Sequence, residues 1–194
     1  MAAPTVLLYP GAGSDASHSS LLAVESRLGR RARVERRDFP YRRQGRRAPD
    51  RAARLMASIR EDLASFSRRR SPLVMGGRSM GGRMTSRVAA DVDGAGPVDR
   101  LAGLVLICYP LHPPGKPDAL RVEHLPDVTV PCLFVSGTRD PFGSPDELTR
   151  WTATIPAPVE HVWIDGGRHD LRGADAMIAE AVDEFVSSLS TPER

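Results

Sequence analysis

Short apolar runs alternate with longer amphipathic stretches along most of this chain. Six runs have the length and the Val, Leu and Ile content of strands: residues 5–9, 33–38, 73–76, 101–108, 132–136 and 159–164. Five stretches repeat their apolar residues with the period of a helix: residues 17–29, 50–69, 80–91, 145–154 and 172–189. This alternation predicts an α/β fold, with a parallel sheet of about six strands and helices on both faces.

A proline-rich segment, residues 109–131, joins two of these strands and shows little periodicity. It leaves the carboxyl end of a strand, where α/β proteins bind ligands, so we interpret it as a long connection with a functional role. The chain has 194 residues, of which 41% are hydrophobic. This length and composition predict a single domain over residues 1–194.

No apolar run approaches the ~18 residues that span a bilayer, and the first residues lack the basic start of a signal peptide. We therefore expect a soluble, cytoplasmic protein that does not enter membranes. The two cysteines, Cys108 and Cys132, fall at opposite ends of their predicted strands, so a disulfide between them is not expected. They fit small buried apolar residues of a reducing compartment.

The charges are unevenly distributed. The chain has 26 Arg and one Lys, and ten of the arginines lie between Arg27 and Arg47. This flank is either a surface for anions or nucleic acids or a solvated face of helices and loops. Aromatic residues do not interleave with the arginines as stacking platforms do, so nucleic-acid binding is not expected.

The stretch PLVMGGRSMGGR, residues 72–83, contains the pattern Gly-x-Ser-x-Gly around Ser79, between a predicted strand and a predicted helix. This is the context of a nucleophile elbow, in which small residues allow a sharp turn that lifts the serine hydroxyl above the sheet. The helix that follows directs its N-terminal amides at the serine and favours a developing oxyanion. A plain glycine-rich strand-to-helix turn is the structural alternative.

A serine nucleophile needs a base, and the base needs a carboxylate to hold it. Asp140 follows the strand 132–136, and His169 follows the strand 159–164, so both lie at carboxyl ends of strands, as Ser79 does. Asp165 and Asp170 lie in the same loop as His169 and are less able to reach its ring, which favours Asp140. Of the other histidines, His124 and His161 fit structural roles, and His18 and His112 fit either solvated loop positions or the lining of a pocket.

An oxyanion hole needs two backbone amides, which we assign to Met80 and to Ala12, with Gly11 or Gly13 as alternatives for the second. The residues expected to line a substrate pocket are Gly11, Gly13, Arg78, Tyr109 and His112. Arg83 opposes the dipole of its helix, so it pairs with an acid or binds an anionic group. No motif with metal-ligand spacing occurs, and no cofactor is expected.

The first glycine-rich loop has a second interpretation. Its stretch GAGSDA, residues 11–16, fits a dinucleotide-binding turn, with Glu35 or Asp38 as the ribose ligand. That interpretation leaves the placement of Ser79, Asp140 and His169 unexplained.

Four stretches are specific when taken together: GGRSMGGR, YPLHPPGKP, HLPDVTVPCLFVSGTRDPFG and GGRHDL. They resemble the α/β-hydrolase superfamily, and within it a small group related to dienelactone hydrolases and to the hydrolase-like domain of a nonspecific-lethal chromatin complex subunit. The resemblance implies a minimal α/β-hydrolase fold that begins at the superfamily's third strand and has no lid domain, so that only residues 109–131 would cover the pocket.

The same resemblance implies a function. Ser79 would be the nucleophile, His169 the base and Asp140 the acid in hydrolysis of a small ester, thioester or related acyl substrate through an acyl-enzyme, without metal or cofactor. Some members of the group serve in complexes, so the alternative is a catalytically silent binding or assembly module. The sequence does not indicate an oligomeric state.

Overall fold

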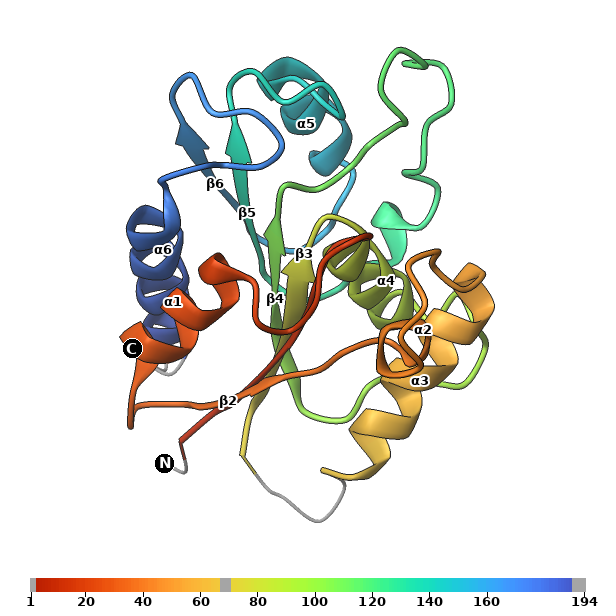
Figure 1. The fold of residues 1–194 in the computed structure, drawn as a ribbon, viewed down its shortest axis with the longest axis vertical. Helices are drawn as coiled ribbons and strands as arrows, with labels where there is room; N and C mark the ends of the chain where they lie inside the picture. The colour runs from red at the N-terminus through yellow and green to blue at the C-terminus, as the bar shows by residue number, and fades with distance from the viewer. Residues whose placement is uncertain (1–2, 67–70, 190–194) are drawn as a thin grey trace.

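A computed structural model describes residues 3–66 and 71–189 and contains a fully parallel sheet (Figure 1). Its strands are β1 (Thr5–Tyr9), β2 (Arg33–Arg36), β3 (Leu73–Arg78), β4 (Leu101–Ile107), β5 (Cys132–Gly137) and β6 (Val159–Ile164). They are arranged in the order β2-β1-β3-β4-β5-β6. The chain therefore reverses its direction of travel across the sheet between β1 and β3, and α/β proteins bind ligands beyond the carboxyl ends of strands at such a point.

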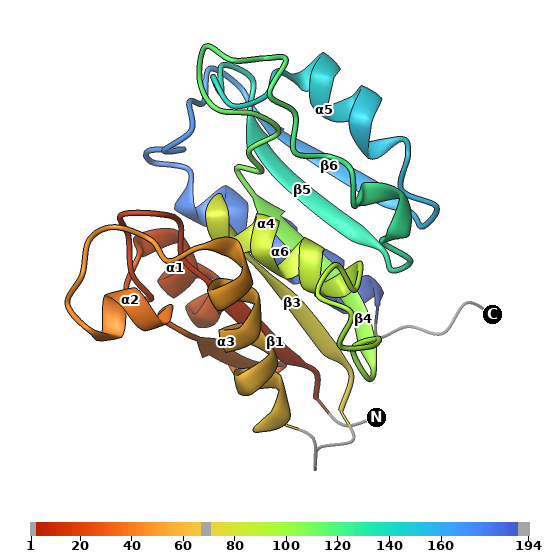
Figure 2. The same ribbon diagram turned by 90° about the vertical axis from the view of Figure 1, so that its right-hand side faces the viewer.

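Helices cover both faces of the sheet, as Figure 2 shows. One face carries α1 (Ser19–Leu28) and α6 (Asp175–Ser188). The other face carries α2 (Pro40–Arg43), α3 (Ala52–Ala64), α4 (Met80–Ala89) and α5 (Pro145–Thr152). Each layer has its own apolar core, so β1, β3 and β5 are buried on both faces. This explains why these strands read as continuous apolar runs rather than as alternating ones.

The predicted α/β architecture is confirmed, and the differences concern short elements and boundaries. The predicted helix 50–69 is observed over Ala52–Ala64, and positions 67–69 of that prediction lie outside the described residues. The helix α2 was not predicted, because four residues are too few to establish a helical period. Within residues 109–131 the chain forms a 3₁₀ turn, Leu125–Asp127, which is anchored by the buried Leu125 and Val128.

Most arginines of the flank between Arg27 and Arg47 are paired with carboxylates. The paired ones are Arg27, Arg31, Arg33, Arg36, Arg37, Arg42 and Arg46. The expectation that no aromatic residue interleaves with these arginines is wrong, because Phe39 and Tyr41 lie among them in the sequence, but both are fully buried and cannot stack on bases. The flank is therefore a network of surface ion pairs with less free positive charge than the sequence suggests.

Both cysteines are buried free thiols, in agreement with the absence of a predicted disulfide. Burial raises the pKa of each thiol to about 12, so both are uncharged apolar groups. In the part of the chain that the structure describes, no helix combines the length and the apolar content needed to cross a membrane.

Candidate active site

The turn from β3 into α4 places Ser79 in a backbone conformation that side chains rarely adopt. Its φ is 49° and its ψ is −114°, and its amide donates a hydrogen bond to the last residue of β4, the Ile107 carbonyl, over 2.7 Å. A Cβ on Gly81 would lie 2.3 Å from the Tyr9 carbonyl oxygen, so α4 can approach β1 only because this residue is glycine. The strained turn and the close approach are the geometry of a nucleophile elbow.

A continuous chain of hydrogen bonds connects Ser79 to a buried carboxylate through His169. The His169 Nε2 lies 2.9 Å from the Ser79 Oγ, and its Nδ1 lies 2.8 and 3.0 Å from the two Asp140 oxygens. The Asp140 side chain is 2% exposed, and one of its oxygens accepts a hydrogen bond from the Phe142 amide. This order of groups lets the imidazole take a proton from the hydroxyl while the carboxylate holds the ring.

The loops that carry Asp140 and His169 are bound to each other. The Arg139 amide donates to the Gly167 carbonyl over 2.8 Å, and the Gly166 amide donates to the Thr138 hydroxyl over the same distance. The Phe142 ring packs on the imidazole of His169, with 4.0 Å between the ring centroids. Asp165 and Asp170, the competing acids, bond to Thr138 and to the Arg172 amide instead.

Arg78, the residue before the serine, contacts the loop of His169. Its Nη2 donates to the His169 carbonyl oxygen over 2.6 Å, although the two residues are 91 positions apart. The residue is 6% exposed, and its Nη1 has no hydrogen-bond partner among the described residues. Arg78 therefore fixes the backbone of the histidine loop, a role that the sequence did not indicate, and its predicted place in a substrate pocket stays a prediction.

The loop after β1 lies beside the serine. A Cβ on Gly11 would be 3.4 Å from the Ser79 Cβ, and Gly13 has a φ of 78°. Ala12 is exposed between them, and Met80 is half-buried as the first residue of α4. The amides of Met80 and Ala12 thus come from the two segments that border the serine, but their role as oxyanion donors stays a prediction.

A family model described as an alpha/beta hydrolase domain matches residues 2–188. The chain belongs to the alpha/beta hydrolases. The match spans the sheet, both helical layers and all three residues of the hydrogen-bonded chain. The predicted membership of the superfamily is thereby confirmed.

Solved structures of other alpha/beta hydrolases have the same fold as this one. Est1E from Butyrivibrio proteoclasticus matches with a TM-score of 0.74 at 16% identity, over 96% of this chain and 88% of that chain. A monoacylglycerol lipase from Paleococcus ferrophilus matches with a TM-score of 0.74 at 16% identity, over 96% and 95% of the two chains. The type II thioesterase BorB from the borrelidin biosynthetic cluster matches with a TM-score of 0.71 at 17% identity, over 95% and 93%.

Tyr109 and His112, two further residues predicted for the pocket of this alpha/beta hydrolase, are buried. The Tyr109 hydroxyl lies 3.2 Å from the Ser86 hydroxyl and 3.1 Å from the His124 Nε2, and burial raises its pKa to about 12. The His112 amide donates to the Phe142 carbonyl over 3.3 Å, which ties residues 109–131 to the loop of Asp140. The structure records packing contacts for both residues, and contact with a substrate stays a prediction.

His124 and His161 have the structural contacts that the sequence predicts, whereas His18, for which the sequence favours a solvated position, is half-buried. Burial lowers the pKa of His124 to about 4, so this ring is neutral at pH 7. His161 stacks against Phe134 and Trp163, and His18 caps the first turn of α1 through its Nδ1.

Two hollows in the surface lie at opposite ends of the sheet. The first, of about 500 Å³, borders His169 and is formed by Arg139, Pro141, Arg168 and Asp170. It lies at the carboxyl ends of β5 and β6, at the end of the sheet that carries Ser79.

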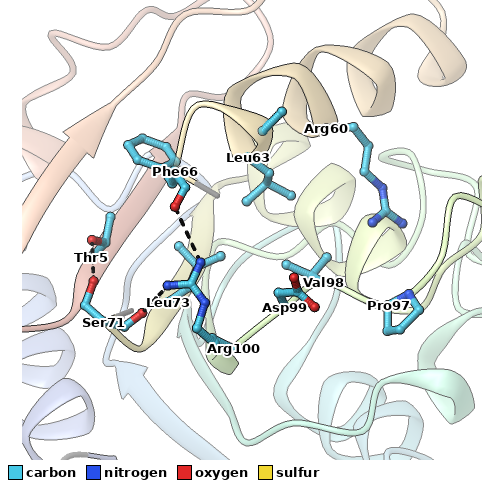
Figure 3. A pocket seen from close by; sticks show the side chains of 11 residues that line it. Thr5, Arg60, Leu63, Phe66, Ser71, Leu73, Pro97, Val98, Asp99 and Arg100 are labelled. Atoms are coloured by element: carbon cyan, nitrogen blue, oxygen red, sulfur yellow. Dashed lines mark hydrogen bonds between the residues drawn. The ribbon is translucent and has the colours of Figure 1, made fainter. Parts of the chain in front are cut away.

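The second hollow, of about 270 Å³, lies at the amino ends of β1 and β3 (Figure 3). There Arg100 donates to the carbonyl oxygens of Ser71 and Phe66, and Thr5 and Leu73 begin the two strands. The six-residue length of β3, roughly 20 Å, separates it from Ser79, so it is not part of the candidate site.

The geometry of the first loop disfavours dinucleotide binding. In a dinucleotide-binding turn the glycines open directly into a helix whose N-terminus holds the pyrophosphate. Here α1 begins only at Ser19, and its first turn is capped by His18 rather than left open. Asp38 accepts a hydrogen bond from the Ala16 amide, and Glu35 pairs with Arg33 and Arg37. Among the described residues no cluster of three His, Cys, Asp or Glu side chains is placed to hold a metal ion.

Proposed function

We propose that this alpha/beta hydrolase is a serine hydrolase that cleaves a small ester, thioester or related acyl compound through an acyl-enzyme. The observation that carries the proposal is the unbroken series of hydrogen bonds from Asp140 through His169 to the Ser79 hydroxyl. Further support comes from solved structures of the same fold, which include a lipase and a thioesterase.

In the first half of the reaction the Ser79 Oγ attacks the carbonyl carbon of the substrate. His169 Nε2 takes the hydroxyl proton, and the carbonyl oxygen becomes an oxyanion that the amides of Met80 and Ala12 stabilise. When the tetrahedral intermediate collapses, the bond to the leaving group breaks and His169 gives its proton to that group. Asp140 holds the imidazolium throughout by accepting from its Nδ1–H.

In the second half a water molecule attacks the acyl carbon of the ester on Ser79. His169 takes a proton from the water and returns it to the Ser79 oxygen as the acid leaves. His169 is thus the protein group that accepts or donates the proton in each transfer.

A fluorophosphonate probe tests the nucleophile. We expect it to label Ser79 and to leave Ser79→Ala unlabelled, while Ser26→Ala, which changes an exposed serine of α1, keeps the label. Labelling that persists in Ser79→Ala contradicts the proposal.

Hydrolysis of p-nitrophenyl acetate and butyrate tests the base. His169→Ala removes the group that accepts the serine proton, and we expect kcat/KM to fall by about 10³-fold or more. Equal rates for the wild type and His169→Ala would favour a catalytically silent binding module.

A further inference from the structure

Two arginines beside the proposed site differ from the other arginines of the described residues. The other arginines that are buried or half-buried each have a hydrogen-bond or ion-pair partner: Arg36, Arg37, Arg42, Arg60, Arg78 and Arg87. Arg83 and Arg121 are also half-buried, but neither guanidinium group has a hydrogen bond or an ion pair with a described residue. The remaining arginines of the described residues whose guanidinium groups have no such partner are exposed, where water solvates the charge at little cost.

The charges of these two arginines lie close enough to interact, although 38 positions separate the residues. Arg83 and Arg87 follow Ser79 at intervals of four residues and so lie on one side of α4. Residues 109–131 pass over this side, because Arg87 forms a 3.0 Å ion pair with Glu123. Arg121 belongs to the same segment, which its amide anchors by donating to the Leu111 carbonyl over 2.8 Å.

The electrostatics of this pair are unfavourable without a ligand. Burial, and then the nearby charge of Arg121, lowers the pKa of the Arg83 guanidinium. Glu123 also lies close enough to interact with Arg83, but its carboxylate is held by Arg87. Neither guanidinium therefore has a carboxylate of its own among the described residues, and the half-buried charge of Arg83 lies close enough to that of Arg121 to interact with it. This arrangement favours any anion that can enter.

The position of the pair relative to the nucleophile suggests what the anion is attached to. Arg83 lies one turn along α4 from Ser79, and its amide donates to the Ser79 carbonyl over 3.0 Å. Four residues of helix correspond to a rise of ~6 Å. A chain of roughly two or three methylene groups can span that rise, so an acyl group of that length could reach the guanidinium groups from an ester carbonyl at Ser79.

We propose that Arg83 and Arg121 form a subsite for a carboxylate at the far end of the acyl chain, so that the substrate is a short dicarboxylic acid monoester or monothioester. This inference rests on the proposed function, because it places the scissile carbonyl at Ser79. The planar guanidinium group can donate two parallel hydrogen bonds to a planar carboxylate, and hydrogen bonds between charged groups are stronger than those between neutral groups.

Matched ester pairs test the subsite. p-Nitrophenyl hemisuccinate differs from p-nitrophenyl butyrate by a carboxylate in place of a methyl group, and the hemiglutarate differs from the valerate in the same way. Arg83→Met and Arg121→Met remove the charge and keep an unbranched side chain. We expect each to lower the ratio of kcat/KM for the anionic ester to that for the neutral ester by about tenfold, with little change for the neutral ester.

Two control variants distinguish a local carboxylate subsite from a long-range effect of the protein's positive charge on anionic esters. Arg30→Met with Arg47→Met removes the same charge from exposed, unpaired arginines, and we expect the ratio to stay at the wild-type value. Arg139→Met with Arg168→Met removes the charges beside His169. A ratio that falls only in this second double variant, or one that is unchanged in Arg83→Met and Arg121→Met, overturns the proposal.

A binding measurement separates this inference from the hydrolase proposal. Ser79→Ala cannot turn over, so titration calorimetry of this variant with monomethyl glutarate and with methyl valerate, which has a methyl group in place of the free carboxylate, reports binding alone. We expect monomethyl glutarate to bind at least about tenfold more tightly than methyl valerate, and the difference to vanish when Arg83→Met is added. If no p-nitrophenyl ester is hydrolysed but this difference is found, the hydrolase proposal fails and the anion site stands. Equal binding of the two methyl esters overturns the anion site whatever the hydrolysis shows.

Discussion

Arg78 offers the sharpest test of how the fold supports the proposed chemistry, because it holds His169 by the backbone and not by the ring. Arg78→Ala removes the 2.6 Å bond from its Nη2 to the His169 carbonyl. A bond between a charged donor and a carbonyl contributes roughly 1.5–3 kcal/mol. The same substitution removes a guanidinium that is 6% exposed and whose Nη1 has no described partner, and the burial of that charge offsets part of the contribution.

The two effects predict a variant that folds and is catalytically impaired. The free energy of unfolding should change by no more than about 2 kcal/mol, because the lost bond and the relieved burial oppose each other. The His169 loop loses its support, and a displacement of ~1 Å in a reacting group can cost about 10²-fold in rate. We therefore expect kcat for p-nitrophenyl butyrate to fall by about 10- to 100-fold, with KM changed much less.

Chemical rescue separates this positioning role from loss of structure. Arg78→Ala leaves a cavity at the serine end of β3, and free guanidinium ion at millimolar concentration should bind there and restore part of kcat. Arg51→Ala, which removes an exposed guanidinium group that has no hydrogen bond or ion pair with a described residue, is the matched control and should show neither loss nor rescue. A stable Arg78→Ala protein with the wild-type kcat would refute the positioning role, as would a loss of kcat that guanidinium leaves unchanged while urea unfolding shows an intact fold.

Three further outcomes follow from the structure. Gly81→Ala should destabilise the fold by at least about 3 kcal/mol in urea unfolding, since its Cβ would lie 2.3 Å from the Tyr9 oxygen; a stability within 1 kcal/mol of the wild type would contradict the close approach. Burial lowers the pKa of His124 to about 4, so this histidine binds a proton more readily in the unfolded chain than in the folded protein. The free energy of unfolding should therefore be highest above pH ~6.5 and should fall by up to roughly 3 kcal/mol as the pH is lowered toward 4. His124→Gln should make this fall smaller in thermal unfolding scans from pH 7 to 4. The paired arginine flank should bind DNA or RNA only weakly and lose it by ~0.15 M salt, whereas a sub-micromolar complex with a steep salt slope, abolished by Arg42→Ala with Arg43→Ala and Arg46→Ala, would make nucleic-acid binding the better proposal.

The sheet and the meeting of Ser79, Asp140 and His169 could be predicted because both follow from the order of elements. The strands Thr5–Tyr9 and Val159–Ile164 have the bounds that their apolar runs predict. Carboxyl ends of parallel strands meet at one edge of a sheet, so three polar residues that each follow a strand are brought together whatever the details of packing. The helix Pro40–Arg43 could not be predicted, because its position depends on the packing of Tyr41 in the core rather than on a local period.

Charge pairing is the part that the sequence could not predict, because it depends on contacts between distant residues. The densest run of arginines, from Arg27 to Arg47, is where a basic surface was considered from the sequence, yet Asp183 alone pairs with two of its members from 150 positions away or more. Arg83 and Arg121 lie outside this run, and only the path of residues 109–131 over α4 brings their charges together. A count of charges along a chain measures how much charge is present, whereas binding depends on the charge left unpaired. Among the described residues, Arg83 and Arg121 are the half-buried arginines whose guanidinium groups have no hydrogen-bond or ion-pair partner, and Arg83 lies one helical turn from the proposed nucleophile.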